Sequence, residues 1–159
     1  MTQKHNLTPA QAVYIATQME QRAVSLYERA LLVFAQGKMK QVLQELLEDE
    51  RSHLSGFERL QQMEGTVAPE DALALDSEAG GILFSDGITG AVREGAFDSP
   101  ISLLHFAADE EERAAQRYHG FAEATFGETR ETFLLISWQE QRHLERLKTQ
   151  ISLLEETDA

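Results

Sequence analysis

Residues 46–54 read Leu46-Leu47-Glu48-Asp49-Glu50-Arg51-Ser52-His53-Leu54. The leucines recur at helical spacing, and Glu50 and His53, three residues apart, fall on the same helix face as these leucines. A glutamate and a histidine therefore interrupt a stripe that should be buried. Burying a carboxylate is costly unless a partner compensates its charge, so the stretch predicts a polar site inside a helical core.

The same arrangement occurs a second time in the chain, at Glu140, His143 and Leu144. Two further stripes each carry a lone glutamate inside the motif Glu-x-Arg-Ala-x-x-x-Tyr, which occurs as Glu20, Arg22, Ala23, Tyr27 and as Glu111, Arg113, Ala114, Tyr118. The lone and paired glutamates are 30 residues apart in the first half (20 to 50) and 29 in the second (111 to 140). A two-helix hairpin used twice would bring the two half-sites face to face.

Four long helical patterns surround these motifs, over about residues 9–36, 38–64, 100–126 and 128–154. Thr8-Pro9 and Ser99-Pro100 have the form of an N-cap followed by proline at the first helical position. Glycines at 37, 65 and 127 are expected to end helices. Each pattern would extend roughly 40 Å.

The segment 65–98, between the second and third patterns, is different. It holds six of the ten glycines and is acidic, and a short helical piece is expected near residues 89–96. Its apolar residues are expected to lie against the helices: Leu73, Leu75, Ile82, Leu83, Phe84 and Ile88. Because structureless loops of this length are uncommon, we interpret it as a crossover. The chain is therefore predicted to be a single all-α domain, residues 1–159, folded as an antiparallel four-helix bundle with ferritin-like connectivity and one long crossover.

Composition excludes several classes of protein. The 159 residues carry a formal net charge of -13, which argues against binding nucleic acid or anionic lipid. The chain has no cysteine, so disulfides, thiolate zinc sites and iron–sulfur ligation are excluded. No apolar run approaches the ~20 residues that span a bilayer, and residues 1–7 lack a secretory signal, so a soluble, cytoplasmic protein is expected.

The interrupted stripes together predict a metal centre. Four carboxylates converging in a core would repel one another unless cations hold them together, and two divalent cations, or a diferric pair with a bridging oxide, would balance four negative charges. Oxygen and imidazole donors without sulfur suit iron or manganese. The predicted ligands are Glu20, Glu50, His53, Glu111, Glu140 and His143. The alternative is a metal-free bundle whose glutamates lie at exposed helix edges.

Other residues are interpreted by their position relative to these ligands. Tyr27 and Tyr118, two turns past the lone glutamates, are either core aromatics or supports for the ligands, and the second interpretation is favoured. Asp49 could reach His143, whereas the equivalent residue is Gln139, which would leave His53 without a carboxylate partner. That difference predicts two inequivalent metal positions, unless both residues merely face solvent.

The remaining titratable residues near the motifs are expected outside the site. His105 and His119 are predicted at the surface or its boundary. In the acidic run 110–112 only Glu111 is in phase with the buried stripe, so Glu110 and Glu112 are expected to face solvent.

These motifs resemble the rubrerythrin-like, erythrin-type branch of the ferritin-like superfamily, over about residues 9–64 and 100–154. The resemblance implies a non-haem diiron centre, with Glu20 and Glu111 as terminal ligands, Glu50 and Glu140 as bridging ligands, and His53 and His143 as terminal nitrogen ligands. It also implies supporting tyrosines at Tyr27 and Tyr118, and a homodimer. Manganese or zinc could substitute for the two iron ions.

Two departures from the family pattern bear on function. Rubrerythrins proper carry a cysteine-containing rubredoxin domain, so electrons would come here from a separate rubredoxin-like donor. Many also have a glutamate one turn after the third-helix ligand, where this chain has Ala114. That replacement leaves dimetal binding intact and bears on the efficiency of peroxide reduction.

The first functional hypothesis is therefore a diiron oxidoreductase that reduces hydrogen peroxide in oxidative-stress defence. Its catalytic groups would be the four glutamates with Tyr27 and Tyr118. The second is a ferroxidase that oxidises ferrous iron with dioxygen for storage or detoxification. A metal-dependent structural or sensor domain and a manganese catalase are further alternatives.

Overall fold

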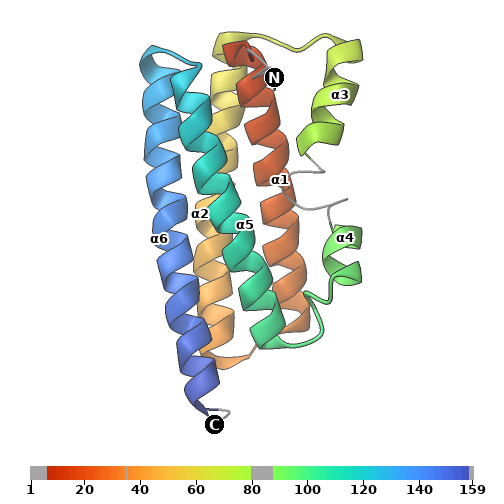
Figure 1. The fold of residues 1–159 in the computed structure, drawn as a ribbon, viewed down its shortest axis with the longest axis vertical. Helices are drawn as coiled ribbons and strands as arrows, with labels where there is room; N and C mark the ends of the chain where they lie inside the picture. The colour runs from red at the N-terminus through yellow and green to blue at the C-terminus, as the bar shows by residue number, and fades with distance from the viewer. Residues whose placement is uncertain (1–6, 35, 80–87, 158–159) are drawn as a thin grey trace, which may run out of the picture.

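The computed structural model describes residues 7–34, 36–79 and 88–157, which are mostly helical and contain no strand. Four long helices lie side by side: α1 (Pro9–Val33), α2 (Gly37–Glu64), α5 (Pro100–Glu123) and α6 (Gly127–Thr157) (Figure 1). Two shorter helices, α3 (Pro69–Ala79) and α4 (Ile88–Arg93), lie beside α1. The predicted all-α class is confirmed. Within the described ranges, no helix is both long enough and apolar enough to cross a bilayer.

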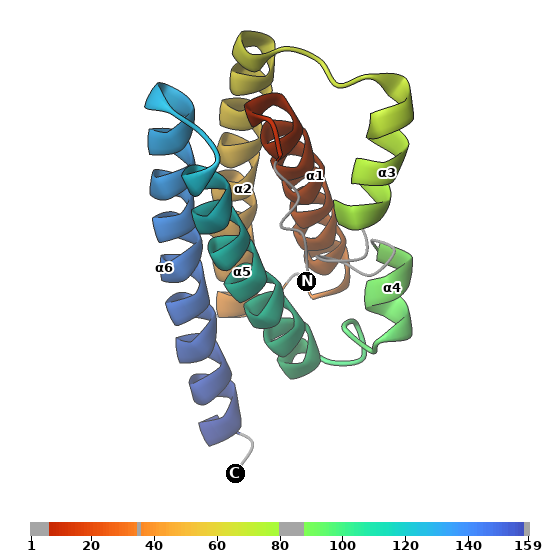
Figure 2. The same cartoon turned by 45° about the horizontal axis from the view of Figure 1, so that its top comes forward.

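The long helices form two antiparallel hairpins, α1 with α2 and α5 with α6, each packed along its length. Contacts between the hairpins are made by α1 with α5 and by α2 with α6. As Figures 1 and 2 show, α2 and α5 run in the same direction, because the segment that includes α3 and α4 returns the chain to the opposite end of the molecule. The two halves that carry the repeated motifs therefore face each other.

Both predicted proline starts are confirmed. The Thr8 hydroxyl accepts a hydrogen bond from the Gln11 backbone N–H, and the Gln11 side chain accepts one from the Thr8 N–H, both at 3.1 Å. The Ser99 hydroxyl accepts a 3.1 Å hydrogen bond from the Ser102 N–H. These caps satisfy N–H groups that have no partner inside the helix.

The predicted helix ends were less accurate. α1 ends at Val33 rather than 36, where Phe34 leaves the helical conformation and its N–H still bonds to the Ala30 carbonyl. Gly37 has a φ of +58° and begins α2 instead of ending α1. α5 ends at Glu123, before the predicted 126, and α6 continues to Thr157, past the predicted 154.

The crossover contains more helix than predicted. α3 was not expected, although it begins at a proline, Pro69, with Glu70 and Asp71 in its first turn. Acidic side chains there stabilise the helix by their interaction with its dipole. α4 coincides with most of the short helical piece predicted near residues 89–96.

The two leucines of α3, Leu73 and Leu75, lie on opposite sides of this helix. Leu75 is buried, but the expectation for Leu73 was wrong, since 76% of its surface is exposed. Residues two apart on a helix are about 200° apart around its axis, so Leu73 and Leu75 cannot both face α1. The expectations for Ile82, Leu83, Phe84 and the Ile88 side chain concern atoms outside the described part of the chain.

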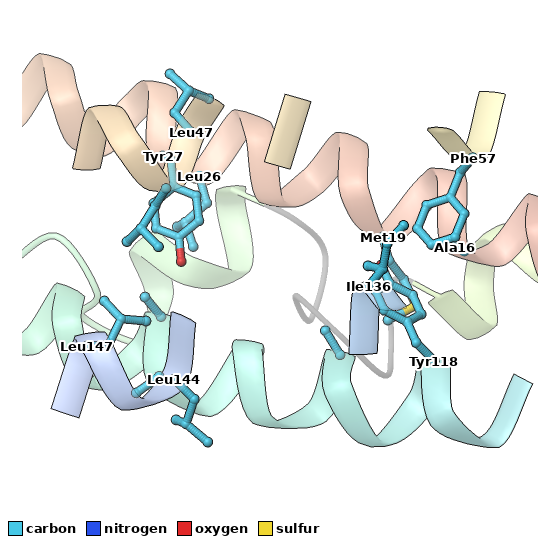
Figure 3. Close-up of a cluster of buried hydrophobic side chains, with 14 of the residues drawn as sticks. Ala16, Met19, Leu26, Tyr27, Leu47, Phe57, Tyr118, Ile136, Leu144 and Leu147 are labelled. Atoms are coloured by element: carbon cyan, nitrogen blue, oxygen red, sulfur yellow. The ribbon is translucent and has the colours of Figure 1, made fainter. Parts of the chain in front are cut away.

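Figure 3 shows two groups of buried core side chains that lie apart along the bundle, and each contains one of the two tyrosines of the repeated motif. One group contains Tyr27, Leu26, Leu47, Leu144 and Leu147, and the other contains Tyr118, Phe57, Met19, Ala16 and Ile136. On α2, Glu50 and His53 fall between Leu47 of one group and Phe57 of the other. On α6, Glu140 and His143 fall between Ile136 and Leu144 in the same way. The glutamates and histidines that interrupt the apolar stripes therefore lie at the same level along the axis of the bundle.

Candidate metal centre

The six predicted ligands are all buried at this level, one or two from each long helix. None exposes more than 6% of its surface, and Glu50 exposes none. Their elements are α1 for Glu20, α2 for Glu50 and His53, α5 for Glu111, and α6 for Glu140 and His143. The convergence of the four stripes, predicted from their periodicity, is therefore observed.

Within the described ranges, two groups of acidic and histidine side chains are arranged so that they could hold a metal ion. The first is Glu20, Glu50, His53 and Glu140; the second is Glu50, Glu111, Glu140 and His143. In each group the ligand atoms lie within 4.8 Å of one another. Glu50 and Glu140 belong to both groups, which is the arrangement needed for two neighbouring ions that share two carboxylates.

The Nδ1 atoms of both histidines face the carboxylates. His53 Nδ1 lies 2.9 Å from Glu140 Oε1 and 3.6 Å from Glu20 Oε1. His143 Nδ1 lies 3.0 Å from Glu50 Oε1 and 3.5 Å from Glu111 Oε2. The rings are stacked, with centroids 5.7 Å apart. Each half therefore offers one imidazole nitrogen and one lone glutamate beside the shared pair.

The Nε2 atoms face outward, each to a residue of the opposite hairpin. Asp49 Oδ2 lies 3.0 Å from His143 Nε2, and Gln139 Oε1 lies 2.7 Å from His53 Nε2. With a cation at the cluster, an acceptor at Nε2 would hold the remaining proton there and leave Nδ1 as a lone-pair donor towards the ion. The predicted contact of Asp49 with His143 is confirmed, as is the lack of a carboxylate at the outer nitrogen of His53.

The tyrosines also reach across the molecule. Tyr27 donates a 2.7 Å hydrogen bond to Glu111 Oε1, and Tyr118 donates a 2.9 Å hydrogen bond to Glu20 Oε1. Both rings are buried. Burial and the nearby glutamates raise the pKa of both hydroxyls well above the usual value, so both tyrosines remain protonated donors. Their interpretation as supports for the lone glutamates, rather than as core aromatics alone, is favoured by these contacts.

Protons are strongly held in this cluster. Burial and neighbouring carboxylates raise the pKa of Glu50 and of Glu140 to about 7, and they raise the pKa of Glu20 well above its usual value. Burial acts to lower the histidine pKa values, but contacts with glutamates outweigh it, so the pKa of His53 and of His143 is raised. Glu111 differs, since its contacts with His143 outweigh burial and lower its pKa to about 2. A cation would have to displace the protons held here.

The lack of hydrogen-bond partners for several donor atoms also fits a metal pair. Five of the six side chains each have one buried oxygen or nitrogen without a hydrogen-bond partner: Glu20 Oε2, Glu50 Oε2, His53 Nδ1, Glu111 Oε2 and Glu140 Oε1. Buried polar atoms are rarely left unpaired, because the loss of hydration is then uncompensated. Concentrated at one level of the core, these atoms form a donor set that cations would satisfy.

Glu110 was missed by the sequence analysis, which expected it to face solvent. Only 5% of its surface is exposed; its Oε1 accepts a 3.0 Å hydrogen bond from Arg113, and its Oε2 has no partner. Burial raises the pKa of Glu110 to about 8. A signal was present, since Glu110 is three residues after Ala107 and four before Ala114, both buried.

A small cavity lies against the carboxylate side of the cluster. Its volume is about 10 Å³, room for about one water molecule. Glu20, Glu111 and Glu140 line it with Glu110, and the alanines of the repeated motif, Ala23 and Ala114, form part of its wall. The short side chains at these two positions are what leave the space open.

On the opposite side, the histidines lie beneath a solvent-facing hollow between α2 and α6, with a volume of about 260 Å³. Asp49, Gln139 and the exposed Trp138 are among the residues that line it. The cluster is therefore separated from water by little more than the histidine rings on this side. His105 and His119 are exposed and lie outside the cluster, as predicted.

Comparisons of the chain with protein-family models, with curated proteins and with solved structures gave no match. The assignment of function therefore depends on the geometry of the site.

Proposed function

We propose that this chain is a rubrerythrin-like member of the ferritin-like superfamily and a non-haem diiron oxidoreductase that reduces hydrogen peroxide. One observation carries the proposal: two buried three-glutamate, one-histidine groups share Glu50 and Glu140. Two hairpins joined by one long crossover are in keeping with a ferritin-like bundle. An all-oxygen and imidazole donor set favours iron or manganese over metals that prefer thiolate.

In this proposal the side chains divide into three roles. Glu20 with His53 would hold one ion, Glu111 with His143 the other, and Glu50 and Glu140 would contact both. A ferrous pair, when bound, supplies the two electrons that, with two protons, convert hydrogen peroxide to two molecules of water. A separate electron-donor protein would restore the reduced state.

The chain itself would orient the ligands and limit access of water. Tyr27 and Tyr118 fix the lone glutamates through their hydroxyl protons, while Asp49 and Gln139 fix the imidazole rings. The apolar core residues that flank the ligands along the helices would limit the access of water to the cluster. The cavity beside Ala23 and Ala114 leaves room for about one water molecule on the carboxylate side.

A ferroxidase is the second candidate, and Ala114 is the observation that favours it. In many rubrerythrins a further glutamate stands at this position, whereas here a buried methyl group lines the cavity. The six proposed ligands are then not joined by a glutamate at position 114 that could take part in redox-linked movement of an iron. In this reading dioxygen would be the oxidant and ferrous iron the substrate.

Stopped-flow oxidation distinguishes the two candidates. Reduced protein loaded anaerobically with iron is mixed in parallel with hydrogen peroxide and with dioxygen. The peroxidase predicts much faster oxidation by peroxide that saturates at two irons per chain. Comparable oxidation by dioxygen that continues with excess ferrous iron would favour the ferroxidase, and no iron uptake would exclude both.

A further inference from the structure

The two halves of the candidate metal centre match in every ligand but differ in the residue that faces the outer nitrogen of each histidine. The residue that precedes the paired glutamate is Asp49 on α2 and Gln139 on α6. Each reaches the outer nitrogen of the histidine on the other of these two helices, at 3.0 Å for Asp49 with His143 and 2.7 Å for Gln139 with His53. The geometry is equivalent, but one acceptor is an anion and the other is a neutral amide.

Several other contacts are matched in the two halves. Each lone glutamate accepts a hydrogen bond from a tyrosine of the opposite half, and the two remaining carboxylates belong to both groups. Both histidines have their Nδ1 towards the cluster and are similarly buried. Among the hydrogen bonds that these supporting residues make to the ligands, the acceptor at Nε2 is the one that differs in charge between the halves.

A carboxylate at Nε2 has two effects that an amide lacks. It accepts the N–H more strongly, which makes the inward Nδ1 a better electron-pair donor to a cation. It also adds a negative charge close to one position. Because the Asp49 side chain is 57% exposed, water screens that charge, so the strengthened imidazole is the more important effect.

We propose that Asp49 makes the two metal positions unequal, so that the position at Glu111 and His143 binds a divalent cation first and more tightly than the position at Glu20 and His53. Asp49 and Gln139 are then positioning residues that set the order of loading. The ion at Glu20 and His53, where Gln139 faces the histidine, is then bound more weakly and exchanges more readily with ions in solution. The inference depends on the metal pair of the proposed function, and it extends that proposal to the inequality of its two positions.

Anaerobic calorimetric titration with Mn²⁺, followed by electron paramagnetic resonance, tests the inference. The wild type should bind two ions in resolved steps, and the first equivalent should give the spectrum of an isolated Mn²⁺ ion. Asp49→Asn should weaken the first step by about 10–100-fold, the range found when partners of ligating histidines are changed. Gln139→Asp should strengthen the second step and bring the two steps together.

Two further sets of variants locate the tighter position. Glu20→Ala should keep the tight step, and Glu111→Ala should keep only the weaker one. The exchange variant Asp49→Gln with Gln139→Asp keeps the same net charge and should reverse this result when combined with each of them. A merely structural role of Asp49 would not transfer with the exchange.

The outcomes separate the failure of this inference from that of the proposed function. Two equal steps in the wild type, or an Asp49→Asn protein that binds as the wild type does, would overturn the order of loading and leave the metal pair in place. A wild type that binds no Mn²⁺, Fe²⁺ or Co²⁺ would overturn both. Thermal unfolding of each variant, measured without metal, checks that it is folded.

Discussion

The Tyr27 hydroxyl on α1 donates a 2.7 Å hydrogen bond to Glu111 on α5, a residue 84 positions later in the chain. Tyr118 on α5 returns the contact to Glu20 on α1 at 2.9 Å. The repeated motif therefore does not support its own glutamate. Each tyrosine orients the lone glutamate of the other hairpin, so the two halves of the cluster are mutually dependent.

Removing either hydroxyl should destabilise the metal-free protein. In Tyr118→Phe the buried Glu20 oxygen loses its donor, and leaving a buried acceptor unpaired costs about 1–3 kcal/mol. Tyr27→Phe is the matched variant for Glu111. Urea unfolding at pH 7 after chelation measures the loss, and a free energy of unfolding equal to that of the wild type in both variants would contradict the assigned role.

The stability of the metal-free protein should fall as pH rises from about 5 to 8. The pKa values of Glu20, Glu50 and Glu140 are raised in the fold, so the stability that they contribute is complete below about 4.5. The contributions of Glu50 and Glu140 are lost as pH rises through about 7, and that of Glu20 is lost as pH rises through its own raised pKa. The raised pKa of each histidine acts in the same direction above its usual value of about 6.5. The lowered pKa of Glu111 contributes stability above about 4.5 and is already fully expressed in this range.

Bound metal should reverse this trend, since cations replace the protons and bind more tightly as pH rises. Scanning calorimetry with and without Mn²⁺ at pH 5, 6.5 and 8 should show the largest difference in melting temperature at pH 8. Glu50→Gln with Glu140→Gln is the control, because it should flatten the pH dependence of the metal-free protein and abolish the effect of metal. A difference that is greatest at pH 5 would be inconsistent with the cluster as described.

Glu110 should affect stability at high pH without holding metal. Its pKa is raised to about 8 by burial, so it stabilises the fold while protonated and loses that contribution as pH rises through about 8. Glu110→Gln should therefore raise the melting temperature at pH 9 and have little effect at pH 5. The number of Mn²⁺ ions bound should stay at two, and a loss of one ion would mean that Glu110 is a ligand.

Ala114→Glu should place a further carboxylate beside the cluster, where 5% of the alanine surface is exposed. An unpaired buried carboxylate should lower the free energy of unfolding of the metal-free protein at pH 8 by about 1–3 kcal/mol. Bound metal should recover much of this loss. Ala23→Glu provides the matched change in the other half, and equal losses with and without metal would show that the new side chain does not reach the ions.

The same variants address the choice between the two candidate reactions. If the extra glutamate favours peroxide reduction, the ratio of the oxidation rates by peroxide and by dioxygen should rise in Ala114→Glu. Stopped-flow mixing of the iron-loaded, reduced protein measures both rates. A ratio unchanged from the wild type would remove Ala114 as an argument for the ferroxidase.

Much of the site was predictable because buried charge is costly. A glutamate in an apolar stripe, such as Glu50 in the stripe of Leu46, Leu47 and Leu54, needs a compensating partner, and four such interruptions had to share one level of the bundle. The opposition of Asp49 to His143 followed from the repeat, which places the residue before each paired glutamate near the other hairpin. The N-caps at Thr8 and Ser99 were also predictable, because a cap depends only on residues close to it in the sequence.

Other features depended on packing that the periodicity of one helix does not contain. Glu110 is buried because the buried arc of α5 is wide, including Ala107 and Ala108 together, and the crossover residue Glu94 lies close enough to raise its pKa. α1 ends early because Phe34 leaves the helical conformation before Gly37 is reached. The direction of a buried face can be read from a sequence, but its width depends on how many neighbours cover it.

The most direct test of the account is the location of bound metal by anomalous diffraction from crystals grown with Mn²⁺ or loaded anaerobically with Fe²⁺. We predict two anomalous peaks per chain, one contacted by Glu20 and His53, the other by Glu111 and His143, with Glu50 and Glu140 in contact with both. A single peak, peaks only at surface carboxylates, or a cluster in which Glu50 and Glu140 touch no metal would contradict the central claim.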